Sequence, residues 1–310
     1  MSAMRDKLVL MIEFKPKTAG YGSLAKPRPF LKWAGGKRSL LAEITPLIPV
    51  FKGRYIEPFL GAGAVFFSLP PTVPKMVNDF NHELIETYRA IRDFPDVLLD
   101  QLRLHVNTRE HYLQVRGQDR EHSFEMMGAA DRAARFIFLN KACFNGLYRV
   151  NSKGQFNVPF GDQKNPDIVS ESNIREVSKF LNSPSGVQLF SGDYRGLTSK
   201  AGPEDFVYLD PPYDPMTQTS SFVAYQSAGF SRSDQVDLRD EVLRLTNIGV
   251  PVLLSNSDTQ FVRALYEDAD VFEVKSVTAK RVISAKANSR GRVSEVLVSN
   301  YGHLQKELFF

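Results

Sequence analysis

Cysteine is almost absent from this chain, since Cys143 is the only one among 310 residues. A single thiol excludes an intramolecular disulfide and any metal site built from several cysteines, which suits a reducing compartment. The five histidines show no metal-ligand spacing, so we expect no metal. The apolar run at residues 8–12 is too short to span a membrane and lacks a signal-peptide layout, so we expect a cytoplasmic protein.

Net charge is also small, at +4 from 39 basic and 35 acidic residues, so composition alone says little about a nucleic-acid partner. Two stretches nevertheless lack any acid. Exposed helix faces usually alternate sign, so we interpret both as phosphate-facing surface, with a role in solubility as the alternative for the second. The first stretch, 132–161, contains Arg132, Arg135, Lys141, Arg149 and Lys153, and the second, 274–294, contains Lys275, Lys280, Arg281, Lys286, Arg290 and Arg292.

Strand and helix patterns alternate from about residue 26, which predicts an α/β fold. The expected helices are 39–48 with Ser39 as its N-cap, 64–69, 82–92 and 129–142. Residues 93–165 interrupt the alternation and end in short alternating segments at 144–161, which predict a hairpin. Residues 1–25 show no sustained period. The expected strands are 55–60, 76–79, 187–190, 205–209, 250–255 and 293–298.

A glycine-rich turn follows the first expected strand, and an acid ends the second. Gly61 and Gly63 allow backbone to approach a ligand, and Asp79, 18 residues after Gly61, is suited to bind ribose hydroxyls. Phe66 occupies the place of the third glycine of a dinucleotide fingerprint, which favours a ligand without a pyrophosphate. Lys37, after two glycines and at the start of an expected helix, predicts an anion-receptive corner.

The sequence Asp210-Pro211-Pro212-Tyr213 directly follows the apolar strand pattern at 206–209. Neither proline has an N–H, and the first forces the Asp toward extended geometry, so we expect turn carbonyls to remain available as acceptors. A carboxylate and a carbonyl can accept both hydrogens of an exocyclic amino group, while an aromatic ring stacks on the base. An ordinary strand-ending turn is the alternative.

The hairpin pattern at 144–161 interleaves aromatic side chains with basic and amide side chains. This mixture is typical of segments that read base edges and fill a gap in a base stack. Packing of the aromatics on a core is the alternative.

Seven motifs in this order resemble those of the DNA adenine methyltransferases of the Dam type, and the resemblance spans residues 29–301. Any one motif alone is modest evidence for the family, whereas seven motifs in the family's order make the resemblance specific. They are Phe-Leu-Lys-Trp-Ala-Gly-Gly-Lys at 30–37, Glu-Pro-Phe-Leu-Gly-Ala-Gly at 57–63, Asp79 with Asn81, Phe-Asn-Val-Pro-Phe-Gly at 156–161, Gly-Asp-Tyr at 192–194, Asp-Pro-Pro-Tyr at 210–213, and Ser-Asn at 255–256.

The resemblance implies a Rossmann-like α/β domain, residues 26–92 and 166–303, that binds S-adenosylmethionine. A mainly helical target-recognition domain carrying a β-hairpin, residues 93–165, would interrupt it, with an extension at 1–25 and a tail at 304–310. Asp210 and the Pro211 carbonyl would hold the amino group of adenine, and Tyr213 would stack on it. The implied cofactor residues are Trp33, Lys37, Glu57, Phe59, Gly61, Gly63, Asp79, Asp193 and Asp210.

By the same resemblance, the partner is double-stranded DNA, the target adenine is flipped out of the helix, and the site is GATC. Arg149 would read guanine, and Lys32 would approach the guanine on the 5′ side of the adenine. Phe144, which replaces a Tyr of relatives, and the unassigned Tyr148 depart from the family pattern. No obligatory protein partner is expected. The implied DNA-binding residues are Lys32, Phe144, Asn145, Leu147, Arg149, Asn157 and Pro159.

Three other functions compete with this interpretation. A methyltransferase acting on RNA bases or protein glutamine uses a related motif, although Asn commonly replaces Asp in the glutamine case. A DNA-binding regulator without catalysis would not need the intact motif at 210–213. A nicotinamide oxidoreductase is disfavoured by Phe66 and by the lack of a hydride-transfer constellation.

Overall fold

A computed structural model describes residues 26–214, 230–267, 270–280 and 292–301. The expected N-terminal extension, 1–25, and C-terminal tail, 304–310, lie outside these described residues. So does the middle of the second acid-free stretch, 281–291, with Arg281, Lys286 and Arg290.

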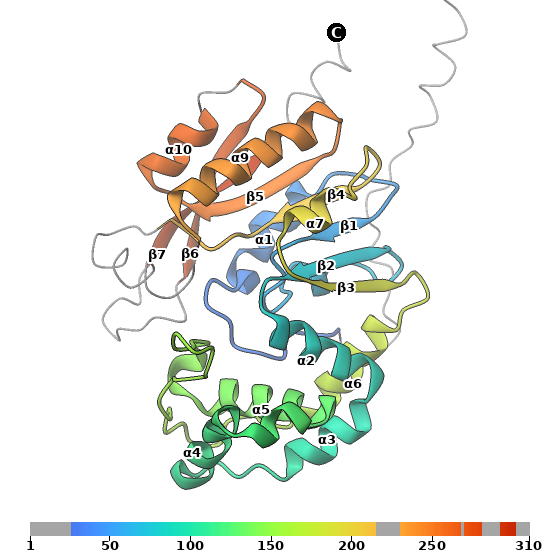
Figure 1. Cartoon of the computed structure of the whole chain (residues 1–310). Coiled ribbons are helices and arrows are strands. Elements are labelled where there is room, and N and C mark those ends of the chain that lie inside the picture. The colour runs from blue at the N-terminus through green and yellow to red at the C-terminus, as the bar shows by residue number, and fades with distance from the viewer. Residues whose placement is uncertain (1–25, 215–229, 268–269, 281–291, 302–310) are drawn as a thin grey trace, which may run out of the picture.

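Seven strands form one twisted sheet in the order β3-β2-β1-β4-β5-β7-β6 (Figure 1). The first five of that order run parallel, whereas β7 is antiparallel to both of its neighbours. This sheet confirms the expected α/β fold. The strands are β1 (Tyr55–Glu57), β2 (Lys75–Asp79), β3 (Val187–Ser191), β4 (Phe206–Leu209), β5 (Val252–Ser257), β6 (Glu273–Lys280) and β7 (Arg292–Ser299).

Helices cover both faces of the sheet, because successive strand residues point to opposite faces. In β4, Phe206 and Tyr208 join the core on the side of α2 (His82–Asp93) and α6 (Glu171–Leu181). Val207 and Leu209 join the core on the side of α9 and α10. Buried apolar residues therefore run continuously along the central strands rather than in alternation, as is usual for parallel sheets. The helices of the second face are α7 (Arg195–Thr198), α9 (Arg232–Asn247) and α10 (Gln260–Glu267).

The insertion between β2 and β3 is mainly helical, as expected. Figure 1 shows α3, α4 and α5 grouped beyond α2, at the end of the molecule opposite α9 and α10. Phe136 and Ile137 of α5 share the core of α2, whereas Phe138 and Leu139 pack in a second core with Tyr112. The boundaries at 93 and 165 stay a prediction. The helices of the insertion are α3 (Pro95–Arg103), α4 (Arg109–Gly117) and α5 (Ala129–Ala142), with the 3-10 turns Gln118–Arg120, His122–Met126 and Phe144–Gly146.

Several local predictions need correction. The expected helix 39–48 is broken into the 3-10 turn Lys37–Leu40, α1 (Leu41–Ile44) and the 3-10 turn Thr45–Leu47, and Ser39 lies inside the first of these rather than at a cap. Pro46 at the start of the last turn removes a backbone donor that a continuous helix needs. The expected helix 64–69 is one 3-10 turn, Phe66–Ser68, and strand β6 was not predicted.

The hairpin is looser than its sequence pattern suggests. Two isolated antiparallel bridges, Cys143 with Phe160 and Val150 with Phe156, join its arms in place of paired strands. Asn145 and Gly146 take positive φ values of 55° and 64° at its start, which turns the chain sharply out of α5. The two arms of this hairpin therefore do not form a regular two-stranded β-ribbon.

Candidate active site

Four acids sit at or just beyond the carboxyl ends of neighbouring parallel strands. Glu57 ends β1, Asp79 ends β2, Asp193 follows β3, and Asp210 follows β4. The strand order reverses between β1 and β4, and ligands of open α/β sheets bind in the crevice at such a point. The sheet thus brings together acids that are up to 153 residues apart in the chain.

Asp210 is held by two donors that both use its Oδ1 atom. The Nζ of Lys37 lies 2.8 Å from it, and the Oγ of Ser255, from β5, donates at 2.9 Å. Lys37 is almost completely buried and also donates to the carbonyl of Gly35 at 2.5 Å. The predicted anion-receptive lysine therefore already has an anionic partner within the protein, namely the carboxylate of the Asp-Pro-Pro-Tyr motif.

The turn after Asp210 is fixed from two other elements. The Nε2 of Gln235, in α9, donates to the carbonyl of Pro212 at 2.8 Å. The Oε1 of Gln235 in turn accepts a hydrogen bond from the Nδ2 of Asn256 at 2.9 Å. The expectation that the turn carbonyls remain available is therefore wrong for Pro212. Pro211 is buried, and the motif residue Asn256 supports the turn rather than facing a ligand.

Tyr213 is anchored by a residue that sequence reasoning missed. Its hydroxyl donates to Oε2 of Glu295, in β7, at 2.6 Å, and the Nζ of Lys37 lies 4.5 Å from the centroid of its ring. Burial, with the nearby carboxylates of Asp210 and Glu295, raises the pKa of Tyr213 well above its ordinary value, so the phenol stays protonated. The only sequence signal for Glu295 is its position as an acid within the apolar strand pattern at 293–298.

The glycine loop lies between β1 and the 3-10 turn at Phe66, and its backbone requires glycine. Gly61 has φ +49°, and a Cβ there would lie 2.8 Å from Cδ1 of Trp33. Gly63 has φ +70°, and its Cβ would lie 2.9 Å from the hydroxyl of Tyr88. Trp33 therefore packs directly against the loop backbone.

Asp79 fastens this loop through both of its oxygens. The N–H of Gly61 donates to Oδ2 at 2.8 Å, and the N–H of Asn81 donates to Oδ1 at 2.9 Å. Burial raises the pKa of Asp79, and the two backbone donors partly offset that rise. Asp79 thus orders the loop before any ligand arrives, and each oxygen keeps a lone pair for a further donor.

Glu57 is buried at the centre of these acids. Its Oε2 accepts a hydrogen bond from the hydroxyl of Tyr55 at 2.8 Å. Burial raises the pKa of Glu57 well above its ordinary value, and the neighbouring Asp210 and Asp79 raise it further. A cationic ligand beside Glu57 would relieve this repulsion.

Aromatic rings border the acids. Phe59 packs against Tyr194 with ring centroids 5.3 Å apart. Phe80, directly after Asp79, is 81% exposed, and sequence reasoning missed it. The carboxylate of Asp193 accepts the N–H of Arg195 at 2.8 Å at the start of α7, so this acid caps a turn and is otherwise exposed.

The segment after α5 joins the site through Lys32. The side chain of Asn140 accepts the N–H of Lys32 at 2.9 Å and donates to the carbonyls of Lys32 at 2.8 Å and Gly146 at 3.1 Å. A Cβ at Gly146 would lie 2.4 Å from that of Lys32, so the side chain of Lys32 packs against the backbone of Gly146. The Nζ of Lys32 donates to Gln163 at 2.6 Å, and burial lowers the pKa of the amine.

Arg149 and Asn157 lie opposite each other on the arms of the hairpin. Arg149 is exposed, and its Nε donates to Oδ1 of Asn157 at 2.7 Å while its Nη2 donates to the carbonyl of Asn157 at 3.1 Å. Phe144 is 40% exposed, and its N–H donates to the carbonyl of Pro159 at 2.9 Å. Leu147 is half-buried against the core of the insertion. Four of the residues predicted to bind DNA are thus joined in two pairs, Arg149 with Asn157 and Phe144 with Pro159.

A model of the D12 class of N6 adenine-specific DNA methyltransferases matches residues 33–283. The type II methyltransferase M1.LlaDCHI of Lactococcus lactis subsp. cremoris is 45% identical over 89% of this chain and 96% of its own length. The type II methyltransferase M.MjaIII of Methanocaldococcus jannaschii is 38% identical over 88% of this chain and 99% of its own length. The DNA adenine methylase of Vibrio cholerae is 33% identical over 92% and 100%.

This chain belongs to the D12 class. It is a DNA adenine methyltransferase, and its match to the class spans both the strand-end acids and the insertion. None of the helices in the described ranges combines the length and apolar character needed to cross a membrane. Within the same ranges, no group of three or more His, Cys, Asp or Glu side chains is arranged to hold a metal ion.

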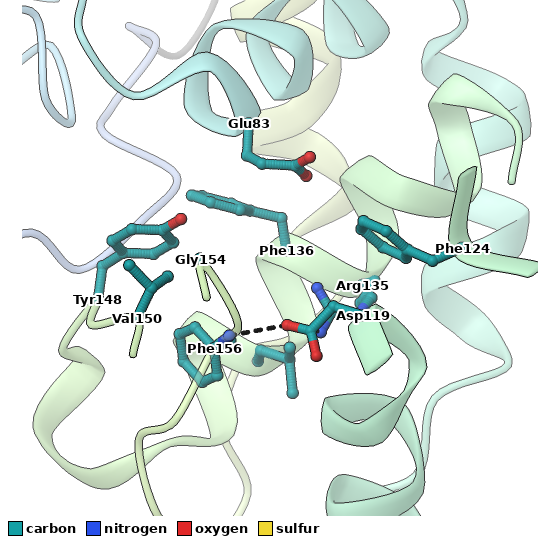
Figure 2. Close-up of a pocket in the computed structure, with 10 residues that line it drawn as sticks. Glu83, Asp119, Phe124, Arg135, Phe136, Tyr148, Val150, Gly154 and Phe156 are labelled. Carbon is teal, nitrogen blue, oxygen red and sulfur yellow. Dashed lines mark hydrogen bonds and ion pairs between the residues drawn. The ribbon is translucent and has the colours of Figure 1, made fainter. Parts of the chain in front are cut away.

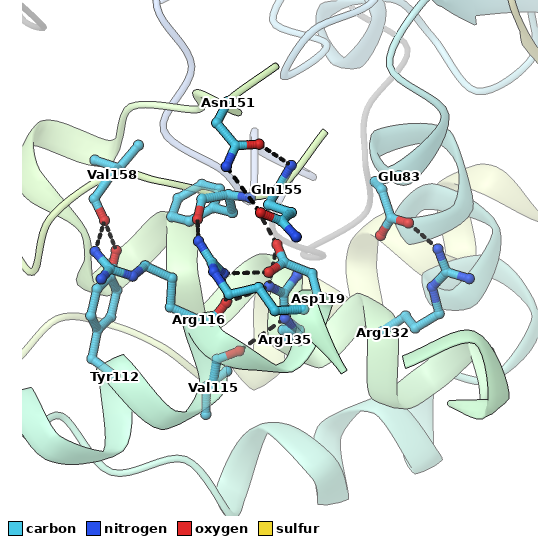
Figure 3. Close-up of polar contacts among 12 residues, drawn as sticks. Glu83, Tyr112, Val115, Arg116, Asp119, Arg132, Arg135, Asn151, Gln155 and Val158 are labelled. Carbon is cyan, nitrogen blue, oxygen red and sulfur yellow. Dashed lines mark hydrogen bonds and ion pairs between the residues drawn. The ribbon is translucent and has the colours of Figure 1, made fainter. Parts of the chain in front are cut away.

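The interpretation of the acid-free stretches as phosphate-facing surface is wrong for Arg135 in this methyltransferase, and two other cations of these stretches have acidic neighbours. Arg135 is buried and paired with Asp119 at 2.8 Å, so it faces the protein interior rather than phosphates. Arg132 is paired with Glu83, as Figure 3 shows. Lys275 of the second stretch lies 3.6 Å from Glu43. Acids distant in sequence neutralise these cations, which no local charge count can reveal.

Proposed function

We propose that this methyltransferase transfers the methyl group of S-adenosylmethionine to the N6 amino group of an adenine flipped out of duplex DNA, within GATC. One observation carries the proposal. The carboxylate of Asp210 and the ring of Tyr213 share one turn at the switch point of the sheet, beside the glycine loop and Asp79. An amino-bearing base held there would lie next to a ligand bound on the loop.

The residues present fit S-adenosylmethionine. The carboxylates of Asp79 and Asp210, which help to raise the pKa of the buried Glu57 between them, make the crevice favourable for a positively charged sulfonium. The remaining lone pairs of Asp79 suit ribose hydroxyls, and the exposed ring of Phe80 next to it suits the face of the cofactor's adenine. Trp33 and Lys37 would adjoin the methionine end. The bound cofactor supplies an activated methyl group on a charged sulfur leaving group.

Asp210 would position the nucleophile. Because Ser255 and Lys37 both use Oδ1, we assign the amino hydrogen of adenine to Oδ2. Accepting the amino hydrogens draws the nitrogen lone pair out of conjugation with the ring and directs it at the methyl carbon. The bound cofactor would supply the methyl carbon, and the electron pair of the broken C–S bond would remain on sulfur as the nitrogen lone pair forms the N–C bond. The N6 proton then leaves to water or to Oδ2 of Asp210.

Tyr213 would hold the flipped base by stacking. Its hydrogen bond to Glu295 fixes the ring, so the stacking face is preorganised and little side-chain entropy is lost on binding. Phe144 and Asn145, at the sharp turn after α5, are the candidates to fill the gap that flipping leaves in the base stack.

Arg149 would read guanine through O6 and N7, the acceptors that a guanidinium matches with two hydrogen bonds. Asn157 holds that guanidinium in place, which supports a preset direction for the contact. Lys32, Leu147 and Pro159 complete the proposed contacts. Given the type II methyltransferases among its relatives, we also propose that the enzyme modifies DNA in a restriction system, in the cytoplasm.

The test is methylation-sensitive sequencing of DNA from cells that express the enzyme, together with in vitro transfer to GATC duplexes. Arg149→Ala should cost about 1 to 3 kcal/mol on GATC and relax discrimination at one guanine, with little loss on other DNA. Asp210→Ala is the catalytic control and should abolish transfer. Equal loss on all sequences would make Arg149 a phosphate contact, and methylation at another sequence would refute the GATC assignment.

A further inference from the structure

Tyr148 lies between two proposed DNA-contacting residues, yet its own side chain points inward. Its ring is stacked on that of Trp33, with centroids 5.7 Å apart and planes inclined by 24°. It also packs against Phe136 of α5 at 5.3 Å and Phe156 of the opposite arm at 5.8 Å. Figure 2 shows Tyr148 beside Phe136 at the edge of a cavity of about 60 Å³. The ring therefore belongs to the contact between the hairpin and the motif at 30–37.

One route leads from Tyr148 to the glycine loop through Trp33. The indole that stacks on Tyr148 is the group that a Cβ on Gly61 would meet at 2.8 Å, so no free space separates the indole from the loop. A displacement of Tyr148 must therefore move Trp33, and a displacement of Trp33 must move the loop or open a gap. Close packing transmits such shifts on the Trp33 side, because the cavity that Tyr148 borders is lined by Phe136 and Phe156 and not by Trp33.

A second route leads to the same place through Asn81. Burial raises the pKa of Tyr148, and the Asn81 side chain partly offsets that rise. The N–H of Asn81 donates to Oδ1 of Asp79 at 2.9 Å, and its side chain caps α2 by accepting the N–H of Leu84 at 3.1 Å. Both routes end at the Asp79 carboxylate, whose other oxygen accepts the N–H of the glycine loop.

On its other side, Tyr148 is continuous with the exposed reading surface. The next residue is Arg149, whose carbonyl accepts the N–H of Asn157 at 3.1 Å and whose guanidinium donates to the same residue. The opposite arm is fixed by Asp119, which accepts the N–H of Phe156 at 2.7 Å. The backbone near Arg149 therefore moves with the arm opposite it, and Tyr148 is its link to the strand-end crevice.

We propose that Tyr148 is a positioning residue that couples DNA recognition at the hairpin to S-adenosylmethionine binding at the glycine loop. The inference rests on the proposed function of both surfaces. Guanine bound to the guanidinium that Asn157 holds would fix the backbone at Arg149 and with it Tyr148, which packs on Trp33 beside Gly61 and Asp79. Such coupling is reciprocal, so cofactor binding must strengthen cognate DNA binding by the same factor.

The experiment measures that factor. Fluorescence anisotropy gives the Kd of a GATC duplex with and without saturating S-adenosylhomocysteine, which cannot react. We expect a ratio of at least about fivefold for the unmodified enzyme and a ratio within about twofold of one for Tyr148→Ala. Tyr148→Phe keeps the stacked ring and should retain most of the ratio. A Tyr148→Ala enzyme with the unmodified ratio would overturn the proposal.

Val150→Ala is the matched control, since Val150 flanks Arg149 on the other side, in the same arm. It should keep the ratio, and equal loss in both variants would show general loosening of the hairpin and overturn the proposal.

Should Tyr148→Ala fail to fold, as judged by urea unfolding, Tyr148→Leu fills the space without a stacking ring and should show the same loss. An unmodified enzyme that binds both ligands with a ratio of one refutes the coupling alone, whereas one that binds neither refutes the proposed function.

Discussion

Replacing Asp119 with Ala should destabilise the enzyme by about 3 kcal/mol, because it leaves a buried guanidinium without its counter-ion. The Oδ2 of Asp119 lies 2.8 Å from Nη2 of Arg135, and both side chains are under 10% exposed, at 8% and 7%. Removal of one partner from a buried pair costs about 3 to 5 kcal/mol. Arg135 keeps hydrogen bonds to the carbonyls of Val115 at 3.0 Å and Arg116 at 3.1 Å, so we expect the lower end.

Arg132→Ala provides the comparison within the same helix. Its ion pair with Glu83 is partly exposed, at 32% and 26%, and such pairs contribute roughly 0 to 1 kcal/mol. Urea unfolding of the unmodified enzyme and the two variants, fitted with a common dependence on urea concentration, gives the loss of free energy of unfolding in each variant. A cost for Asp119→Ala below about 1 kcal/mol, or no greater than that of Arg132→Ala, would refute the reasoning that burial decides the value of the pair.

Asp119 also accepts the N–H of Phe156, so its removal has a local consequence besides the global one. Asp119→Asn keeps an oxygen acceptor for that N–H but removes the charge. Hydrogen exchange at residues 149–157 should therefore accelerate more in the Ala variant than in the Asn variant. Equal acceleration would show that the charge, rather than the backbone hydrogen bond, holds the hairpin arm.

Three further changes test the strand-end site and the core beneath it. Gly61→Ala places a Cβ against Trp33 at a φ of +49°, which costs about 1 to 2 kcal/mol. Calorimetry should therefore show cofactor affinity reduced about tenfold. Unchanged affinity would contradict a rigid loop. Asp79→Ala removes the acceptor for two N–H groups and should weaken cofactor binding by roughly 1.5 to 3 kcal/mol, again by calorimetry. Burial lowers the pKa of Lys75 to about 7, so between pH 7 and about 10.4 the unfolded chain holds a proton that the folded chain has lost. The free energy of unfolding should therefore rise with pH across that window, relative to Lys75→Met, by up to roughly 1.4 kcal/mol per pH unit, and parallel pH curves would show that Lys75 stays charged.

Much of the fold could be predicted from local sequence, because the signals are local. The helix at 129–142 is bounded as expected, since its apolar residues recur at helical spacing over almost four turns. The acids Asp79 and Asp210 end or follow short apolar strands, and parallel strands bring their carboxyl ends to one edge, so the placement of these acids could be predicted, while their roles stay a prediction. The prediction of one helix at 39–48 was wrong because Pro46 lacks a backbone donor, although Leu40 and Ile44 are buried at helical spacing.

The sequence by itself predicted the class of chemistry, because seven motifs in register resemble those of DNA adenine methyltransferases, and the family match confirms that class. It did not determine which charges remain exposed or which residues hold the site in place. Arg135 is neutralised by Asp119 and Tyr213 is fixed by Glu295 across 82 residues, and both pairings depend on which elements the chain packs together. Sheet order and helix packing bring such side-chain partners together. Both depend on the free energy of the whole folded chain, so only the tertiary structure could decide these pairings.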